Sequence, residues 1–136
     1  MDCLKTTKDK HLILRLKDGV SVAKWYIDAS FATYNDFQSH TVGILKIGDD
    51  GGAITNASIK QKINTQSSTE ADLMGVDDLI GKVLWTSRFL ESQGSAPKRN
   101  IILQDNQSSI FLETKGSASA GKGMCNMNVH YCKRFG

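Results

Sequence analysis

The sequence predicts an α/β fold, a mixed β-sheet with helices packed on it, and three observations lead to that prediction. Residues 25–31 alternate between apolar and polar side chains with a period of two, as a half-buried strand does. Residues 48–52 (GDDGG) form a turn signal between two further strand-like segments. After residue 67 the apolar residues recur every three or four positions, which is typical of a long helix.

The first three strands are expected to form an antiparallel meander. One face of the first strand carries Trp25, Ile27, Ala29 and Phe31. Residues 41–47 and 53–60 lie on either side of the glycine-rich turn, whose glycines supply the positive φ angles that a hairpin needs. Because strands joined by short turns pair antiparallel, these three segments form a three-stranded unit.

The long helix is expected over residues 67–93. Ser67 and Glu70 have the spacing of a capping box at its amino end. Gly81 is expected to bend or break the helix, and Gly94 to end it.

The rest of the chain contains one further strand. Residues 100–104 are a short apolar segment that follows a helical crossover, so this strand is expected to be parallel to an earlier one. Residues 107–113 are expected to form a second helix, and residues 115–123, rich in Gly, Ser, Ala and Lys, a flexible loop. Residues 124–136 look like the beginning of another helix.

Composition narrows the class of protein. The chain has 136 residues, of which 40% are hydrophobic and 23% charged, which is the composition of one globular domain. No apolar stretch approaches the ~20 residues that a membrane-spanning helix needs. The amino end lacks the pattern of a secretory signal, and the three cysteines show no C-x-x-C spacing. We therefore expect an intracellular protein of a reducing compartment, not secreted and without membrane contact.

Charge divides the chain into three parts. Residues 1–24 carry six Lys and Arg against three Asp, residues 25–97 five against nine Asp and Glu, and residues 98–136 six against two. Ordinary surface chemistry accounts for an acidic middle between basic ends. A carboxylate site that holds metal, beside basic segments that hold a polyanion, accounts for it equally well.

Three carboxylates occupy positions that simple exposure to solvent does not readily explain. Asp28 interrupts an apolar and aromatic strand, where a buried carboxylate needs a counter-charge or a metal. Asp105 ends the fourth strand, and Glu70 lies in the first turn of the long helix. If the first and fourth strands are neighbours, the three converge, and oxygen ligands favour Mg²⁺ or Mn²⁺. Structural alternatives stay open: Glu70 as the capping partner of Ser67, and Asp105 as the N-cap of the next helix.

The other acids of the long helix are expected on its solvated face. They are Asp72, Asp77, Asp78 and Glu91. Asp77 is the alternative to Glu70 as a ligand, because it lies two turns further along the same side of the helix. His40 is expected to form hydrogen bonds rather than to bind a metal.

Five motifs occur in order along the chain. They are residues 24–32 (KWYIDASFA), 39–43 (SHTVG), 60–73 (KQKINTQSSTEADL), 84–85 (LW) and 104–108 (QDNQS). Together they resemble the ribonuclease H domain of copia-type LTR retrotransposon polyproteins. The resemblance implies a ribonuclease H-like fold, in which a three-stranded antiparallel meander and a parallel strand carry packed helices. Residues 1–22 resemble the tail of the preceding reverse transcriptase, which leaves residues 23–136 as the ribonuclease H-like domain.

The resemblance also implies an activity and its site. Family members are endonucleases that cut the RNA strand of an RNA·DNA hybrid during retrotransposon replication, with Mg²⁺ or Mn²⁺ in a two-ion site. Asp28, Glu70 and Asp105 match the first three catalytic, metal-binding positions. The residues that match nucleic-acid contacts are Thr65, Gln66, Asn106 and Gln107. The implied partners are the hybrid and the reverse transcriptase of the polyprotein.

The chain departs from the family pattern at its carboxyl end. In the family a last strand and a last helix follow, and that helix brings the fourth catalytic carboxylate; neither element is expected in this chain. Activity as a ribonuclease H is therefore left open. The alternative is a non-catalytic, nucleic-acid-binding remnant of a decayed or domesticated retrotransposon polyprotein.

Overall fold

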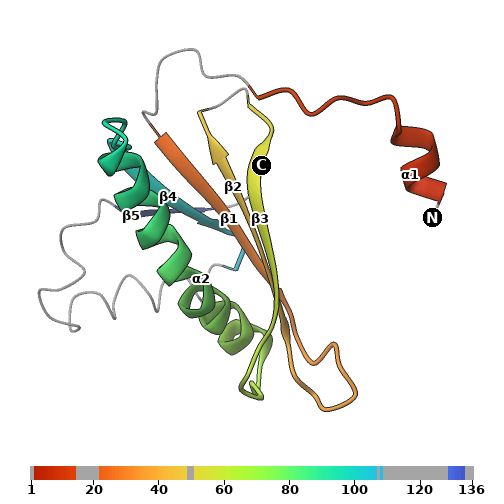
Figure 1. Ribbon diagram of the computed structural model, residues 1–136. Helices are drawn as coiled ribbons and strands as arrows, with labels where there is room; N and C mark the ends of the chain where they lie inside the picture. The colour runs from red at the N-terminus through yellow and green to blue at the C-terminus, as the bar shows by residue number, and fades with distance from the viewer. Residues whose placement is uncertain (1, 15–21, 49–50, 107, 109–128, 134–136) are drawn as a thin grey trace, which may run out of the picture.

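The computed structural model describes residues 2–14, 22–48, 51–106, 108 and 129–133. Its elements in chain order are α1 (Asp2–Thr7), β1 (Val22–Ser30), β2 (His40–Ile47), β3 (Ala53–Lys60), α2 (Ser68–Ser92), β4 (Arg99–Gln104) and β5 (Val129–Lys133). The strands form a single sheet, and α2 lies across one face of it (Figure 1).

The sheet is mixed, as predicted, with the strand order β3-β2-β1-β4-β5. β1 pairs antiparallel with β2, and β2 with β3, which is the predicted meander. β4 runs parallel to β1, so the chain does return beside its first strand after the helical crossover. The α/β fold class is therefore confirmed.

The second edge of β4 differs from the prediction. Residues assigned to a helix form β5, which runs parallel to β4 and pairs Asn100 with Val129. An unpaired edge of β4 would leave backbone groups without partners, and Val129 and Tyr131 favour extended chain. The prediction that the last strand is missing was therefore wrong. No described residue tests the prediction about the last helix.

The hydrophobic core lies between α2 and the sheet. It comprises Ala23, Trp25, Ile27, Leu45, Ala57, Val76, Leu79, Val83 and Ile102. Side chains alternate along β1, so every second one faces the helix. Gly43 of β2 lets the helix approach closely, because a Cβ atom there would overlap the side chain of Leu79. This close packing fixes α2 against the strands that carry the candidate site.

α2 is continuous across Gly81, so the predicted break does not occur. A glycine costs a helix only about 1 kcal/mol relative to alanine, and the apolar packing of the helix offsets that cost. At the amino end, the side chain of Ser67 accepts a hydrogen bond from the backbone N–H of Glu70, as predicted. At the other end Gln93 is the C-cap, and Gly94 follows with a φ of 73°.

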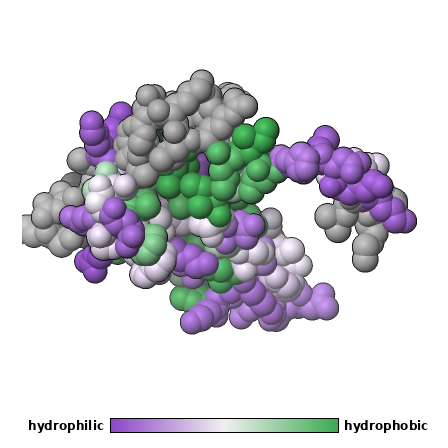
Figure 2. Space-filling view, turned by 45° about the horizontal axis from the view of Figure 1, so that its top comes forward, coloured by the Kyte–Doolittle hydropathy of each residue, from purple (hydrophilic) through white to green (hydrophobic). Residues whose placement is uncertain are grey.

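The amino-terminal segment contacts the sheet at the β2–β3 turn. The backbone N–H of Gly52 donates to the carbonyl oxygen of Ile13 over 3.0 Å. Leu12, Ile13 and Leu14 are exposed, and Figure 2 shows hydrophobic surface beside the polar amino-terminal arm. The division between residues 1–22 and 23–136 stays a prediction.

Two further predictions, the helix over residues 107–113 and the loop over residues 115–123, lie outside the described residues apart from Ser108. In the part of the chain that the structure describes, neither helix combines the length and apolarity needed to cross a membrane.

Candidate functional site

The carboxyl ends of β1 and β4 bring two of the predicted carboxylates together. The parallel register pairs Tyr26 with Leu103. Continued by two residues, the same register brings Asp28 beside Asp105 at one edge of the sheet, where neighbouring strands lie about 4.8 Å apart. The predicted adjacency of the first and fourth strands is thus confirmed, and it is what juxtaposes these two acids.

Asp28 is exposed, although the sequence predicted a buried carboxylate. Side chains alternate along β1, and since Ile27 faces the core, Asp28 faces the other way. There it borders a shallow pocket that Tyr26, Val42, Ile44 and Lys46 also line. Its Oδ1 atom accepts a hydrogen bond from the backbone N–H of Ala29 over 3.0 Å.

Asp105 is also exposed, and it directly follows the last residue of β4. The alternative interpretation made Asp105 the N-cap of the next helix. In the structure the neighbouring Asn106 makes the bond typical of an N-cap, because its Oδ1 atom accepts from the backbone N–H of Ser108 over 3.0 Å.

Glu70 is exposed and turns back toward the loop before α2. Its Oε2 atom accepts from the backbone N–H of Gln66 over 2.6 Å, while its own N–H donates to Ser67 Oγ over 3.1 Å. Ser67 therefore caps α2 through the N–H of Glu70, while the Glu70 carboxylate bonds the N–H of Gln66, one residue before the N-cap. A role of Glu70 as a metal ligand stays a prediction.

The prediction that Asp72 lies on the solvated face of α2 is wrong. It is only 7% exposed and belongs to the buried side of the helix, together with Val76 and Leu79. Its Oδ2 atom accepts a hydrogen bond from Asn106 Nδ2 over 2.8 Å. The sequence contained the signal, because the spacings from Asp72 to Val76 and to Leu79 are those of one helix face.

The remaining acids of α2 differ in their exposure. Asp77 and Glu91 are exposed, as predicted. Asp78 is half-buried, and its Oδ2 atom accepts from Thr41 Oγ1 over 3.2 Å.

Burial raises the pKa of Asp72. The hydrogen bond from Asn106 opposes this rise, and the negative charges of Asp28 and Asp105 add to it. Asp28 and Asp105 therefore each lie close enough to Asp72 to repel its carboxylate.

A divalent cation would relieve this repulsion, and carboxylates are the ligands that Mg²⁺ and Mn²⁺ prefer. The chemistry of the donors therefore fits such an ion. Among the described residues, however, no group of three or more His, Cys, Asp or Glu side chains stands close enough together to hold one. Side chains at this edge would have to move to surround a metal.

The predicted nucleic-acid contacts differ in their accessibility. Gln66 is exposed, and Asn106 is half-buried in its bond to Asp72. Thr65 is 6% exposed, and its Oγ1 atom is hydrogen-bonded to Ser39 Oγ over 2.9 Å. Gln107 lies outside the described residues. Contact of these four residues with nucleic acid stays a prediction.

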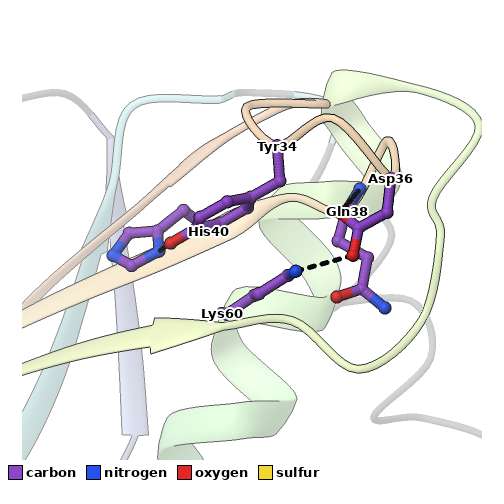
Figure 3. A network of polar contacts seen from close by, with 5 residues as sticks. All are labelled: Tyr34, Asp36, Gln38, His40 and Lys60. Atoms are coloured by element: carbon purple, nitrogen blue, oxygen red, sulfur yellow. Dashed lines mark hydrogen bonds and ion pairs between the residues drawn. The ribbon is translucent and has the colours of Figure 1, made fainter.

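His40 forms hydrogen bonds through both ring nitrogens, as expected. Nδ1 lies 2.7 Å from Tyr34 Oη and Nε2 lies 2.6 Å from Ser58 Oγ. Beside it, Lys60 Nζ lies 2.6 Å from Asp36 Oδ2 and 4.5 Å from the centroid of the Tyr34 ring (Figure 3). The hydrogen bond from Lys60 lowers the pKa of Asp36. These contacts fasten the β1–β2 loop to β2 and β3.

Neither a scan against protein-family models nor a search of curated proteins found a match. Among solved structures, the chain is similar to the protease-reverse transcriptase of prototype foamy virus, with a TM-score of 0.55 and 10% sequence identity over 88% of this chain and 18% of that one. It is also similar to the N-terminal RNase H domain of a Mycobacterium tuberculosis protein, with a TM-score of 0.43 and 10% identity over 82% of each chain. The chain therefore shares its fold with a part of the foamy virus protein.

A third similar structure is the catalytic domain of human endonuclease V, with a TM-score of 0.40 and 12% identity over 77% of this chain and 48% of that one. The present chain spans less than a fifth of the foamy virus protein. At these identities the likeness is one of fold, so the function of this chain has to be argued from its own residues.

Proposed function

We propose that this chain is the ribonuclease H-like domain of a copia-type retrotransposon polyprotein, a metal-dependent endonuclease that cuts the RNA strand of an RNA·DNA hybrid. The observation that carries the proposal is the juxtaposition of Asp28 and Asp105 at the carboxyl ends of two parallel strands, beside the amino end of α2. Open α/β sheets place their sites at this edge.

Each residue of the site has a stated role. Asp28, Glu70 and Asp105 hold Mg²⁺ or Mn²⁺. The bound metal supplies an activated water and stabilises the leaving 3′ oxygen. Gln66 and Asn106, with Thr65 and Gln107, contact the hybrid through its sugar hydroxyls and backbone rather than its base sequence. The reverse transcriptase of the same polyprotein is the proposed partner.

Cleavage of a labelled RNA·DNA hybrid in Mg²⁺ or Mn²⁺ tests the proposal. Asp28→Asn and Asp105→Asn should each lower the rate by at least about 100-fold, because metal binding contributes several kcal/mol to the stabilisation of the transition state. Asp77→Asn is the matched control, since Asp77 is an exposed acid further along α2. It should retain the wild-type rate.

Glu70→Gln separates the two interpretations of that residue. Glutamine keeps an oxygen that can accept the bond from Gln66 but loses the charge that a metal needs. If Glu70 is a ligand, this variant loses cleavage and keeps its unfolding free energy. Unchanged cleavage would restrict Glu70 to its bond with Gln66.

The alternative function is binding of nucleic acid without catalysis. It is favoured by the bond of Glu70 to the N–H of Gln66 and by the lack, among the described side chains, of three positioned to hold a metal. Under this alternative the wild-type chain and Asp28→Asn are equally inert, yet both bind the hybrid with a steep salt dependence. A preference for duplex DNA over the hybrid would contradict the proposed function.

A further inference from the structure

The two residues on either side of Asp105 are attached to the same residue of α2. Gln104 Nε2 donates to the backbone carbonyl oxygen of Asp72 over 2.9 Å. Asn106 Nδ2 donates to the carboxylate of Asp72 over 2.8 Å. Asp105 therefore lies between two residues whose side chains are hydrogen-bonded to one point on the helix.

These attachments are well shielded from water. Gln104 is 2% exposed and Asp72 is 7% exposed. Asn106 is held at its other end as well, because its Oδ1 atom accepts from the N–H of Ser108. Hydrogen bonds in such a setting are directional and costly to leave unmade, so they restrict the backbone at Asp105.

Asp72 also lies near Asp28 on β1. The negative charges of Asp28 and Asp105 both raise the pKa of the Asp72 carboxyl group, so this group stands close to both acids.

The position itself would suit an apolar residue. Asp72 shares the buried side of α2 with Val76 and Leu79, and a buried carboxylate costs free energy that an aliphatic side chain does not. Stability alone therefore does not account for an acid here. The hydrogen bond between Asp72 and Asn106, which follows Asp105, does account for it.

We propose that Asp72 is a positioning residue, whose hydrogen bond with Asn106 holds the neighbouring Asp105 carboxylate in place beside Asp28. The proposal rests on the proposed function, because it assigns these two acids to the reacting site. Residues that orient ligands in this way are typically worth about 10–100-fold in metal affinity or activity.

Three variants test the hydrogen bond between Asn106 and Asp72, with changes at the donor and at the acceptor. Asp72→Ala and Asn106→Ala each remove it, whereas Asp72→Asn keeps an oxygen acceptor for Asn106. Both alanine variants should lower kcat for the hybrid by about 10–100-fold. KM should change little in Asp72→Ala, whereas a rise of KM in Asn106→Ala would report the hybrid contact proposed for Asn106. Asp72→Asn should stay within about threefold of the wild type, and the double alanine variant should be no worse than either single variant.

Asp78→Ala is the matched control, since Asp78 is a half-buried acid on the same helix that accepts a bond from Thr41 instead. It should leave kcat unchanged. If Asp72→Ala fails to fold, Asn106→Ala and Asp72→Asn still decide the proposal. Loss of kcat in Asp72→Asn equal to that in Asn106→Ala would overturn it, because the charge of Asp72 would then act directly. Additive losses in the double variant would overturn it too.

The NMR order parameter of the Asp105 amide gives a readout that does not require activity. It should fall from the value of rigid backbone, about 0.85, in Asn106→Ala and stay there in Asp72→Asn. An inert wild-type chain with this pattern would refute the proposed function and retain the positioning role. An active wild-type chain in which Asn106→Ala changes neither kcat nor the order parameter would refute the positioning role alone.

Discussion

Two stretches of α2 contact the sheet by different means. Its middle packs the apolar side chains of Val76, Leu79 and Val83 against the sheet. Its amino end is held by hydrogen bonds, from Gln61 Nε2 to the carbonyl oxygen of Ala71 over 2.7 Å and from Gln104 Nε2 to that of Asp72 over 2.9 Å. Apolar burial is non-directional and supplies most of the stability, whereas hydrogen bonds are directional. The candidate site therefore lies at the amino end of α2, where directional hydrogen bonds set the position of the helix relative to the sheet.

The largest effect is expected in the apolar stretch. Leu79→Ala removes a fully buried side chain from the centre of the core and should lower the unfolding free energy by about 3 kcal/mol. Urea denaturation measures the change. Trp85→Ala is the control on the same helix, because Trp85 is 65% exposed and its loss should cost about 0.5 kcal/mol. Equal costs would show that the helix middle does not depend on burial.

A smaller effect is expected at the amino end of α2. Gln61→Leu leaves the carbonyl oxygen of Ala71 and the hydroxyl of Thr41 without the bonds that Gln61 donates. The unfolding free energy should fall by about 1–2 kcal/mol, measured in the same way. Lys62→Ala, at the exposed neighbouring position, should change it little. A loss at Gln61 as large as that at Leu79 would contradict the division between the two stretches.

The smallest effect is a pH dependence at Asp72. Its pKa is raised above the unfolded value of 3.8, chiefly by burial. Between these two pKa values the folded chain binds more protons than the unfolded chain, so the contribution to stability is full below pH 3.8 and is lost as the pH rises through the folded pKa. Relative to Asp72→Asn, the wild type should therefore lose unfolding free energy as the pH rises, by less than the loss expected for Gln61→Leu.

Asp36 supplies the opposite control for that experiment. The hydrogen bond from Lys60 lowers its pKa, so its contribution is present above pH 3.8 and is lost as the pH falls through the folded pKa. Chemical denaturation across the acid range, with Asp72→Asn and Asp36→Asn compared with the wild type, should show trends of opposite sign. Parallel trends would show that Asp72 is not a buried, repelled carboxylate.

Much of the fold could be predicted because its signals are local. Alternation in residues 25–31, the turn at residues 48–52 and the cap at Ser67 each depend on a few neighbouring residues. Gly81 was misjudged, because a helix propensity of about 1 kcal/mol is easily outweighed by packing elsewhere along α2. β5 was missed for a similar reason, since its backbone partners lie on β4, far away in the sequence.

The candidate site also has features that local sequence signals predict and features that depend on tertiary packing. The sequence by itself determined that Asp28 lies within the first strand, that Asp105 directly follows the fourth and that Ser67 caps α2, because composition and spacing specify these locally. Only the tertiary structure decided that Asp72 is buried, that Asn106 is bonded to it and that Glu70 turns back to the loop. Burial and hydrogen bonding depend on which side of a helix meets the sheet, and that is settled when distant segments pack together.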